Sequence, residues 1–338
     1  MTSRINGYER QEEAVNSRKK TPEILPELDK LIKDATAGDP ISGLKWTHKS
    51  LRKMADALAR AGHSLSIPTI SRLLYLRSYS LKVNHKRVAG KQSPGRDEQF
   101  HYIEQRRKLF LRRKWPVISV DTKKSELIGN FKNAGKEWRR QARPVNMYDF
   151  PSHASGKAIP YGIYDIGRQE GYVVVGISHD TPAFAVASIR SWWLTIGKKA
   201  YPECPHLLIE ADCGGSNGNR SRVWKARLQD FANEFGLKIT ITHYPTGASK
   251  WNPIEHRMFN LISKNWEGQP LESYETVLKH IRTTTSTSGF RCKARLDKKT
   301  YETGIKVSPK EEKRMKIIPH KVFPNWNYTI HPWLTDKS

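Results

Sequence analysis

The chain has 338 residues, and its 59 Lys and Arg against 33 Asp and Glu give a formal net charge of +26. A surface this basic attracts polyanions and makes nucleic acid the expected partner, whereas an ordinary metabolic enzyme carries far less charge. The sequence has no run of about 18 apolar residues and no apolar leader, which excludes a membrane span and a secretory signal and predicts a soluble, cytoplasmic protein. Three cysteines without C-x-x-C spacing exclude a disulfide framework and a cysteine-based zinc site.

The N-terminal part of the sequence predicts two short helices. Residues 1–40 are polar and are expected to form a poorly ordered or partial N-terminal segment. Within residues 41–80, Thr47 can cap one helix, Gly62 can end it, and Ser66 can cap a second helix that has Pro68 in its first turn. In a basic chain this pattern indicates a DNA-binding helix-turn-helix, with a plain helical hairpin as the alternative. The candidates for the groove-facing side are Thr69, Ser71, Arg72 and Arg77.

Residues 81–114 are rich in Lys and Arg and are interrupted by glycine and proline. They predict a basic linker followed by a helix over 101–114. This helix is expected to lie along a phosphate backbone, and a solvated helix face is the alternative.

From residue 115 the pattern is that of an α/β domain. Short apolar or alternating runs predict strands at 116–120, 159–166, 171–180, 206–211 and 238–245, and helical spacing predicts helices at 184–196, 220–236 and 253–266. This order predicts an α/β fold over 115–282, a mixed sheet with flanking helices. Residues 283–338 are predicted to be a basic C-terminal extension.

Three carboxylates stand at chemically suggestive places. Asp121 and Asp212 each follow a buried-type strand, at the edge where open α/β sheets bind ligands. Glu255 is expected on the sheet-facing side of the 253–266 helix, where an unpartnered carboxylate costs several kcal/mol unless a divalent cation neutralises it. The residues alone leave the alternatives open, because strand-end aspartates often form turns and Asn252 to Glu255 also fits a capping box.

Several long segments carry a resemblance: VISVDTKKSELIGNFKNAGKEW (117–138), KAIPYGIYDI (157–166), LLIEADCGGSNGNR (207–220), HYPTGASKWNPIEHRMFNLISKNW (243–266) and WNYTI (326–330). Together they resemble the Rhodopirellula-type, or ISAzo-type, DDE transposases of bacterial insertion sequences, and residues 46–74 resemble the DNA-binding region of that family. The resemblance implies a ribonuclease H-like catalytic domain. It also implies that Asp121, Asp212 and Glu255 are the catalytic, metal-binding triad.

For such a transposase, phosphodiester transfer needs two Mg²⁺ ions, for which Mn²⁺ can substitute. We expect Asp121 to bridge both ions, while Asp212 and Glu255 each hold one. Water attack at the transposon end frees a 3′-hydroxyl, which then attacks target DNA. The expected partners are double-stranded DNA, as terminal repeats and target, and further copies of the chain in at least a homodimer. The expected location is the bacterial nucleoid, and Lys250 is a candidate phosphate contact.

Two other functions remain as alternatives. One is a catalytically inactive DNA-binding protein on the same fold, and the other is a ribonuclease H-like nuclease without strand transfer. The glycine-containing loop 214–218 lacks the order of a nucleotide-binding loop and predicts a turn after Asp212. His243 and His256, which flank the Glu255 segment, are interpreted as structural histidines.

Overall fold

A computed structural model describes residues 23–33, 36–38, 45–47, 50–77, 79, 95–136, 139–248 and 251–333. The chain divides into two compact units, residues 1–87 and 88–338, and each is described by itself. Within the described ranges, no helix is both long enough and apolar enough to cross a membrane.

The first unit is built from helices α2 (Ile24–Lys33), α3 (Leu51–Arg60) and α4 (Ile67–Leu76), with strands β1 (Thr36–Gly38) and β2 (Lys45–Thr47) paired antiparallel. Ser66 caps α4 by accepting a hydrogen bond from the Thr69 backbone, as predicted. The cap predicted for α3 is wrong, because Ser50 accepts from the Lys53 backbone at 3.3 Å and Thr47 lies in β2. The helix therefore begins three residues later than the predicted cap implies.

The three helices of this unit share one small core. Its buried side chains come from all of them: Ile24, Leu28, Met54, Leu58, Ile70 and Leu73. The predicted N-terminal segment 1–40 thus contains a helix, α2, whose apolar face packs on α3 and α4. Residues 1–22 lie outside the described part of the chain.

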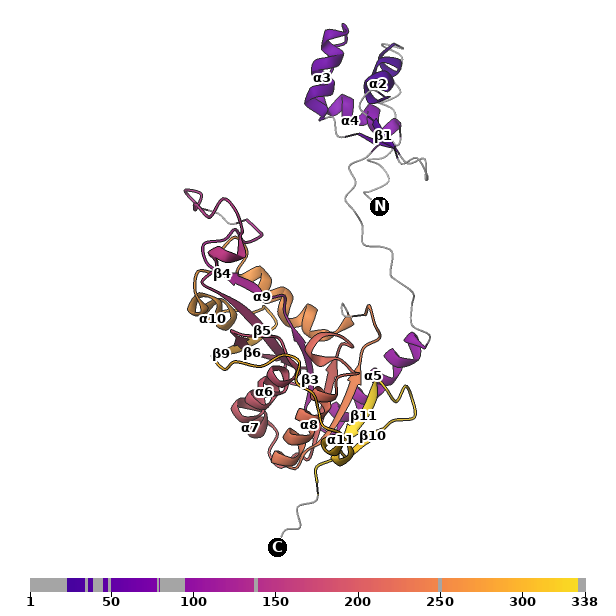
Figure 1. Ribbon diagram of the computed structural model, residues 1–338. Helices are drawn as coiled ribbons and strands as arrows, with labels where there is room; N and C mark the ends of the chain where they lie inside the picture. Colours follow the sequence, from indigo (N-terminus) through magenta and orange to yellow (C-terminus); the bar gives the residue numbers. More distant parts are fainter. Residues whose placement is uncertain are drawn as a thin grey trace. The chain divides into compact units, whose positions relative to one another are not determined.

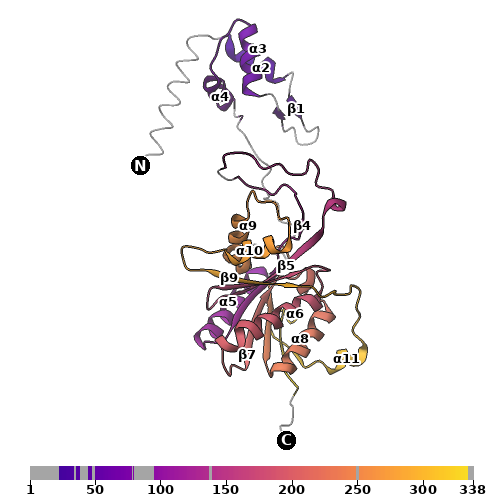
Figure 2. The ribbon, with the colours of Figure 1, turned by 90° about the vertical axis from the view of Figure 1, so that its left-hand side faces the viewer.

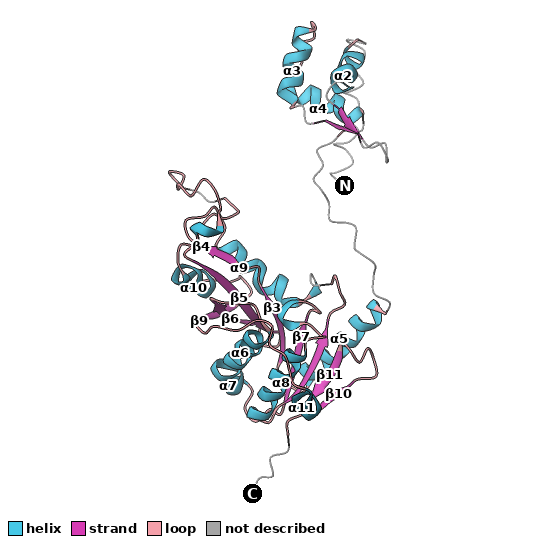
Figure 3. Ribbon diagram, viewed as in Figure 1, coloured by secondary structure: helices cyan, strands magenta, loops and turns pink. Residues whose placement is uncertain are grey.

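The second unit contains a nine-stranded mixed sheet (Figures 1 and 3). The strands lie in the order β10-β11-β8-β7-β3-β5-β6-β9, and β4 pairs with β5 off this path. β3, β5 and β6 are antiparallel neighbours, whereas β7 and β8 continue parallel to β3. This arrangement confirms the α/β prediction and the ribonuclease H-like sheet. The strands are β3 (Val117–Thr122), β4 (Glu126–Ile128), β5 (Gly156–Asp165), β6 (Glu170–Gly176), β7 (His206–Ala211), β8 (Lys238–His243), β9 (Arg291–Asp297), β10 (Ile317–Pro319) and β11 (Asn327–Ile330).

Helices cover both faces of this sheet, as Figure 2 shows, with α6 and α8 on one side and α9 and α10 on the other. Each layer has its own apolar cluster. The first includes Trp192, Trp224 and Phe231, and the second includes Met258, Phe259 and Trp266. The helices of the unit are α5 (Arg96–Arg112), α6 (Pro182–Trp192), α7 (Lys198–Ala200), α8 (Arg222–Phe235), α9 (Asn260–Asn265), α10 (Tyr274–Arg282) and α11 (Pro309–Arg314), with π-helical turns at Trp193–Gly197 and Glu255–Phe259.

Helix α5 begins at Arg96, five residues before the start predicted for the basic helix, and one side of it packs on the sheet. Ile103 and Phe110 are buried. Arg107 forms two hydrogen bonds with the fully buried carboxylate of Glu210, the shorter at 2.5 Å, and a third with the Tyr244 hydroxyl at 2.7 Å. This arginine of the predicted phosphate-binding helix therefore neutralises a carboxylate inside the protein.

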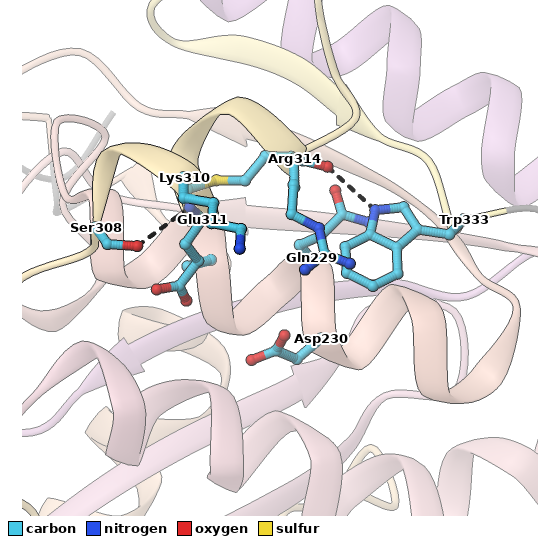
Figure 4. Close-up of a pocket in the computed structure, with 9 residues that line it drawn as sticks. Gln229, Asp230, Ser308, Lys310, Glu311, Arg314 and Trp333 are labelled. Atoms are coloured by element: carbon cyan, nitrogen blue, oxygen red, sulfur yellow. Dashed lines mark hydrogen bonds between the residues drawn. The ribbon is translucent and has the colours of Figure 1, made fainter.

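The region after residue 282, predicted to be a basic extension, contributes three strands to the sheet: β9, β10 and β11. β9 pairs with β6 along its whole length, and β11 pairs with β8. The chain then packs on α8, where a cavity of about 260 Å³ lies between that helix and the C-terminal segment (Figure 4). Trp333 lines this cavity and donates a hydrogen bond from its indole nitrogen to the Arg314 carbonyl at 3.1 Å.

Candidate active site

The two predicted aspartates meet at one edge of the sheet. β3 and β7 are parallel neighbours, with Ser119 opposite Glu210, so their carboxyl ends reach the same side. Asp121 is the fifth residue of β3, and Asp212 directly follows β7. Each carboxylate also has a backbone donor, from Thr122 to Asp121 at 2.7 Å and from Gly214 to Asp212 at 3.2 Å. The loop after Asp212 is thus a turn, as predicted.

Buried hydrogen bonds attach the segment that carries Glu255 to β3. Asn252 and Ser119 are both fully buried. The Ser119 hydroxyl donates to the Asn252 side-chain oxygen and accepts from the Ile254 backbone at 3.1 Å, while the Asn252 amide donates to the Val120 carbonyl at 3.2 Å. Glu255 follows at once in the first turn of the helix. We refer to Ser119 and Asn252 as the β3 latch, because they fix the start of this helix beside the strand that carries Asp121.

The capping box considered for Asn252 and Glu255 is replaced by this latch. The Glu255 backbone donates to the Asn252 carbonyl at 3.1 Å, whereas the Asn252 side chain points to β3. The carboxylate of Glu255 is half-buried, and the residues behind it on the helix, Phe259 and Ile262, are buried against the sheet. Glu255 lies on the sheet side of the helix beside Asp121, as predicted, although the π-helical turn at Glu255–Phe259 departs from the regular α-helical spacing that the prediction assumed.

The three carboxylates interact with one another. Burial, together with the negative charges of Asp212 and Glu255, raises the pKa of Asp121 to about 8. In its protonated form Asp121 donates a hydrogen bond to Glu255. Burial also raises the pKa of Asp212, with Glu255 contributing to the same effect. The three acids, far apart in the sequence, thus lie at one site, where their negative charges disfavour one another's ionisation.

A fourth carboxylate, Asp180, stands beside the triad and was missed in the sequence. It precedes α6 and accepts hydrogen bonds from the hydroxyls of Thr122, at 3.1 Å, and Ser216. These donors follow Asp121 and Asp212 in the chain, and the charge of Asp180 raises the pKa of Asp212. The only sequence signal for it is its place directly before the Thr181-Pro182 start of α6, which reads as ordinary helix capping.

The donor chemistry of the site fits a hard divalent cation, which prefers carboxylate oxygens. His243, the nearest histidine on the neighbouring strand, is fully buried, and its ring bonds the Asp212 carbonyl at 2.8 Å and the Tyr328 hydroxyl at 3.3 Å. Burial lowers its pKa to about 4, so it is the neutral, structural histidine that was predicted. Among the described residues, no group of three or more His, Cys, Asp or Glu side chains is already spaced to hold one metal ion.

The predicted DNA-contacting residues of the first unit differ in exposure and in the polar contacts that they make within the protein. The Thr69 hydroxyl hydrogen-bonds the Ser66 hydroxyl at 2.8 Å, and Ser71 is half-buried. Arg72 is exposed, whereas Arg77 forms an ion pair with Asp29 of α2. Their contact with DNA stays a prediction. Lys250 lies outside the described residues.

Replacing Asp121 by Asn is expected to stabilise the metal-free protein at high pH. The folded-state pKa of about 8 lies above the usual value of 3.8, so the stabilisation by the protonated carboxyl is complete below pH 4 and is lost as pH rises through 8. Asn stays neutral throughout. Thermal unfolding in EDTA should therefore give D121N a higher Tm than the parent at pH 8 and a similar Tm at pH 4. D149N, which changes an exposed aspartate, is the control. A lower Tm for D121N at pH 8 would contradict the raised pKa.

Replacing Asn252 by Ala is expected to reduce activity more than stability. The change leaves the Ser119 hydroxyl and the Val120 carbonyl without their partner, at a cost of about 1–3 kcal/mol in the free energy of unfolding. If the latch positions Glu255 as a metal ligand, its loss should resemble loss of an outer partner of such a ligand, which typically costs about 10–100-fold in activity or metal affinity. DNA cleavage rates and denaturant unfolding measure the two effects, and N260A, on the exposed face of the same helix, is the matched control. Full activity in folded N252A would show that the latch does not position Glu255.

Comparisons with known proteins place these residues in a family. The sequence profile of the Rhodopirellula transposase DDE domain matches residues 27–332. No protein of curated function matches the sequence. Among solved structures, the chain is similar to the Mos1 strand transfer complex, at 16% identity over 75% of this chain and 68% of that one, with a TM-score of 0.43. It is also similar to the mariner Mos1 paired end complex with Mg, at 15% identity, the same coverages and a TM-score of 0.43.

The family match spans both units and includes all three triad positions. The chain belongs to the Rhodopirellula-type family of DDE transposases and is an enzyme of the polynucleotidyl transferase and endonuclease class.

Proposed function

We propose that this transposase binds the terminal repeats of an insertion sequence, cleaves the DNA strand at the transposon end, and transfers the freed 3′-hydroxyl to target DNA. The observation that carries the proposal is the convergence of Asp121, Asp212 and Glu255, each half-buried, with a hydrogen bond between Asp121 and Glu255. Carboxylates that raise one another's pKa form a site prepared for positive charge.

The ligands proposed for two Mg²⁺ or Mn²⁺ ions are the triad carboxylates, with Asp180 close to them. Bound ions would supply Lewis-acid stabilisation of the phosphate oxygens that gain charge during displacement. The protein's own contribution is positional: the β3 latch holds the Glu255 helix, and the hydroxyls of Thr122 and Ser216 hold Asp180. No covalent intermediate with the protein is needed, because water and then the 3′-hydroxyl are the nucleophiles.

The chain is proposed to act as a homodimer or larger assembly, since two transposon ends must be brought together. Its net charge of +26 supports extended contact with terminal-repeat and target duplexes. The charge also favours association with the nucleoid.

Supplying pre-cleaved ends tests the proposed reaction directly. Duplexes that end in the free 3′-hydroxyl of the transposon strand, mixed with plasmid and Mg²⁺, should give joined products. A nuclease without strand transfer would cut the DNA and join none of it, and an inactive DNA-binding protein would do neither. Cleavage without joining would therefore remove strand transfer from the proposal.

A further inference from the structure

A second cavity opens beside the carboxylate edge. It has a volume of about 620 Å³, within the range of small-molecule sites. Its walls come from the loop that follows Asp212, from α8, and from the turn that precedes β11: Asn219, Arg220, Lys225, Phe323, Pro324, Asn325 and Trp326.

Strand pairing places this cavity at the same sheet edge as the triad. Ala211 pairs with His243, so the carboxyl ends of β7 and β8 coincide, and β11 runs antiparallel from that end. The His243 backbone donates to the Trp326 carbonyl at 2.9 Å. The turn 323–326 is therefore two strands along the edge from Asp212, because β8 lies between β7 and β11.

Buried contacts also connect the cavity wall to Asp212. The Lys225 ammonium lies 5.1 Å from the centre of the Tyr328 ring. The Tyr328 hydroxyl bonds one nitrogen of His243, and the other nitrogen bonds the Asp212 carbonyl. A molecule in the cavity would thus have a fixed position relative to the triad.

The cavity presents two aromatic rings on a strained, well-fixed turn. The rings of Phe323 and Trp326 are 5.2 Å apart, centre to centre. Phe323 has a φ of 43°, which is rare and costly for a bulky residue. The backbones of Trp326 and Asn327 both donate to its carbonyl, and its ring covers Gly95 so closely that a Cβ there would lie 2.0 Å away. A strained backbone conformation that several surrounding contacts hold in place is typical of functional sites.

The polar part of the cavity is cationic. Arg220 is exposed beside it, and Lys225 is half-buried, which lowers the pKa of its ammonium group. Aromatic rings together with cations are the composition of sites for single-stranded nucleic acid, where bases stack on rings and phosphates meet Arg or Lys. Bases inside a duplex are already stacked and cannot use the rings, so this chemistry selects an unpaired nucleotide.

We propose that the cavity binds one unpaired nucleotide of the DNA strand held at the active site, with its base against Trp326 and Phe323 and its phosphate toward Arg220 and Lys225. The inference rests on the proposed function, because it assigns part of the same DNA substrate. It predicts that DNA with an unpaired extension at the cleaved end binds more tightly than a flush duplex.

Fluorescence anisotropy with the Glu255→Gln variant of the whole chain, measured without metal, tests this proposal. The probes are a labelled flush duplex and the same duplex with a short unpaired 3′ extension. One stacked base raises affinity about 5- to 150-fold. The parent should therefore bind the extended duplex more tightly than the flush duplex by this factor. Trp326→Ala should remove this gain and leave the affinity for the flush duplex unchanged. The Ala variant keeps the Trp326 carbonyl that bonds His243, and Trp326→Phe should restore most of the gain.

Trp333→Ala is the matched control, because Trp333 lies on the same C-terminal segment but lines the other cavity (Figure 4). It should keep the full gain. If the extension gives no gain in the parent, or if folded Trp326→Ala keeps it, the proposal is overturned. Since no cleavage is measured, a protein that fails to cut or join DNA could still show the gain, so the two proposals can fail separately.

Discussion

Replacing Glu255 by Gln is expected to lower the rate of DNA-strand cleavage by at least about 10³-fold. A carboxylate that holds a catalytic cation contributes several kcal/mol to transition-state stabilisation, and each 1.36 kcal/mol is a factor of ten in rate. Gln preserves the shape of the side chain and removes its charge. The β3 latch involves Asn252 rather than Glu255, so the helix should keep its position. Cleavage of terminal-repeat DNA with Mg²⁺, followed over time on a denaturing gel, measures the effect.

The matched control for this experiment is Glu267→Gln. Glu267 is exposed just beyond the end of the same helix and should leave the cleavage rate within about twofold. Near-equal Tm values for both variants would show that the fold is kept. If Glu255→Gln cleaved as fast as the parent, Glu255 would have no part in the reaction.

Raising the salt concentration from 50 to 200 mM is expected to weaken DNA binding by about 10³–10⁵-fold. This loss is typical of a protein that neutralises six to ten phosphates, and a net charge of +26 supplies enough cations for that number. Anisotropy titrations of a labelled duplex at several salt concentrations give the slope of log affinity against log salt. A flat response would contradict an extended path of DNA across the protein.

A row of cations on the edge strand β9 can be tested for its contribution to the slope of log affinity against log salt. Arg291, Lys293 and Arg295 are exposed on the same face of the strand, alternating with buried residues. Charged side chains on an edge strand also prevent pairing with other chains. If the row lies on a phosphate backbone, its triple Ala variant should lower the slope by almost 3. Arg190→Gln, which removes a cation already paired with Glu234, should leave the slope unchanged.

The strands that carry the two aspartates of the proposed active site could be predicted because their residues are buried on both faces. Continuous apolar runs such as Val117–Val120 and Leu207–Ile209 are distinctive in the sequence, and both strands appear where expected. The aspartates after them could then be assigned to one edge by a general rule of α/β sheets. Assigning Glu255 to the same site also required the helical spacing of its apolar neighbours. The resemblance to a family then decided between the alternatives that the residues left open.

The elements that the sequence did not reveal depend on long-range pairing. β9 reads as a charged segment, since every second residue is Lys or Arg, and only its place at the sheet edge makes it a strand. Ser119 and Asn252 are 133 residues apart, so their hydrogen bond has no local signal. Asp180 looks like one more polar residue before a helix. Its importance appears only when Thr122 and Ser216 are brought to it by the fold.

The π-helical turn at Glu255–Phe259 makes the helix that carries the proposed catalytic Glu255 sensitive to its length. A π turn holds one residue more than an α-helical turn, so the side chains before and after it differ in direction by about 100° from a regular helix. Deleting a single residue within the turn would restore α-helical geometry and rotate either the acid or the apolar stripe that begins at Met258. Natural variation in this stretch should consequently proceed by substitution, with insertions and deletions confined to the loops that flank it.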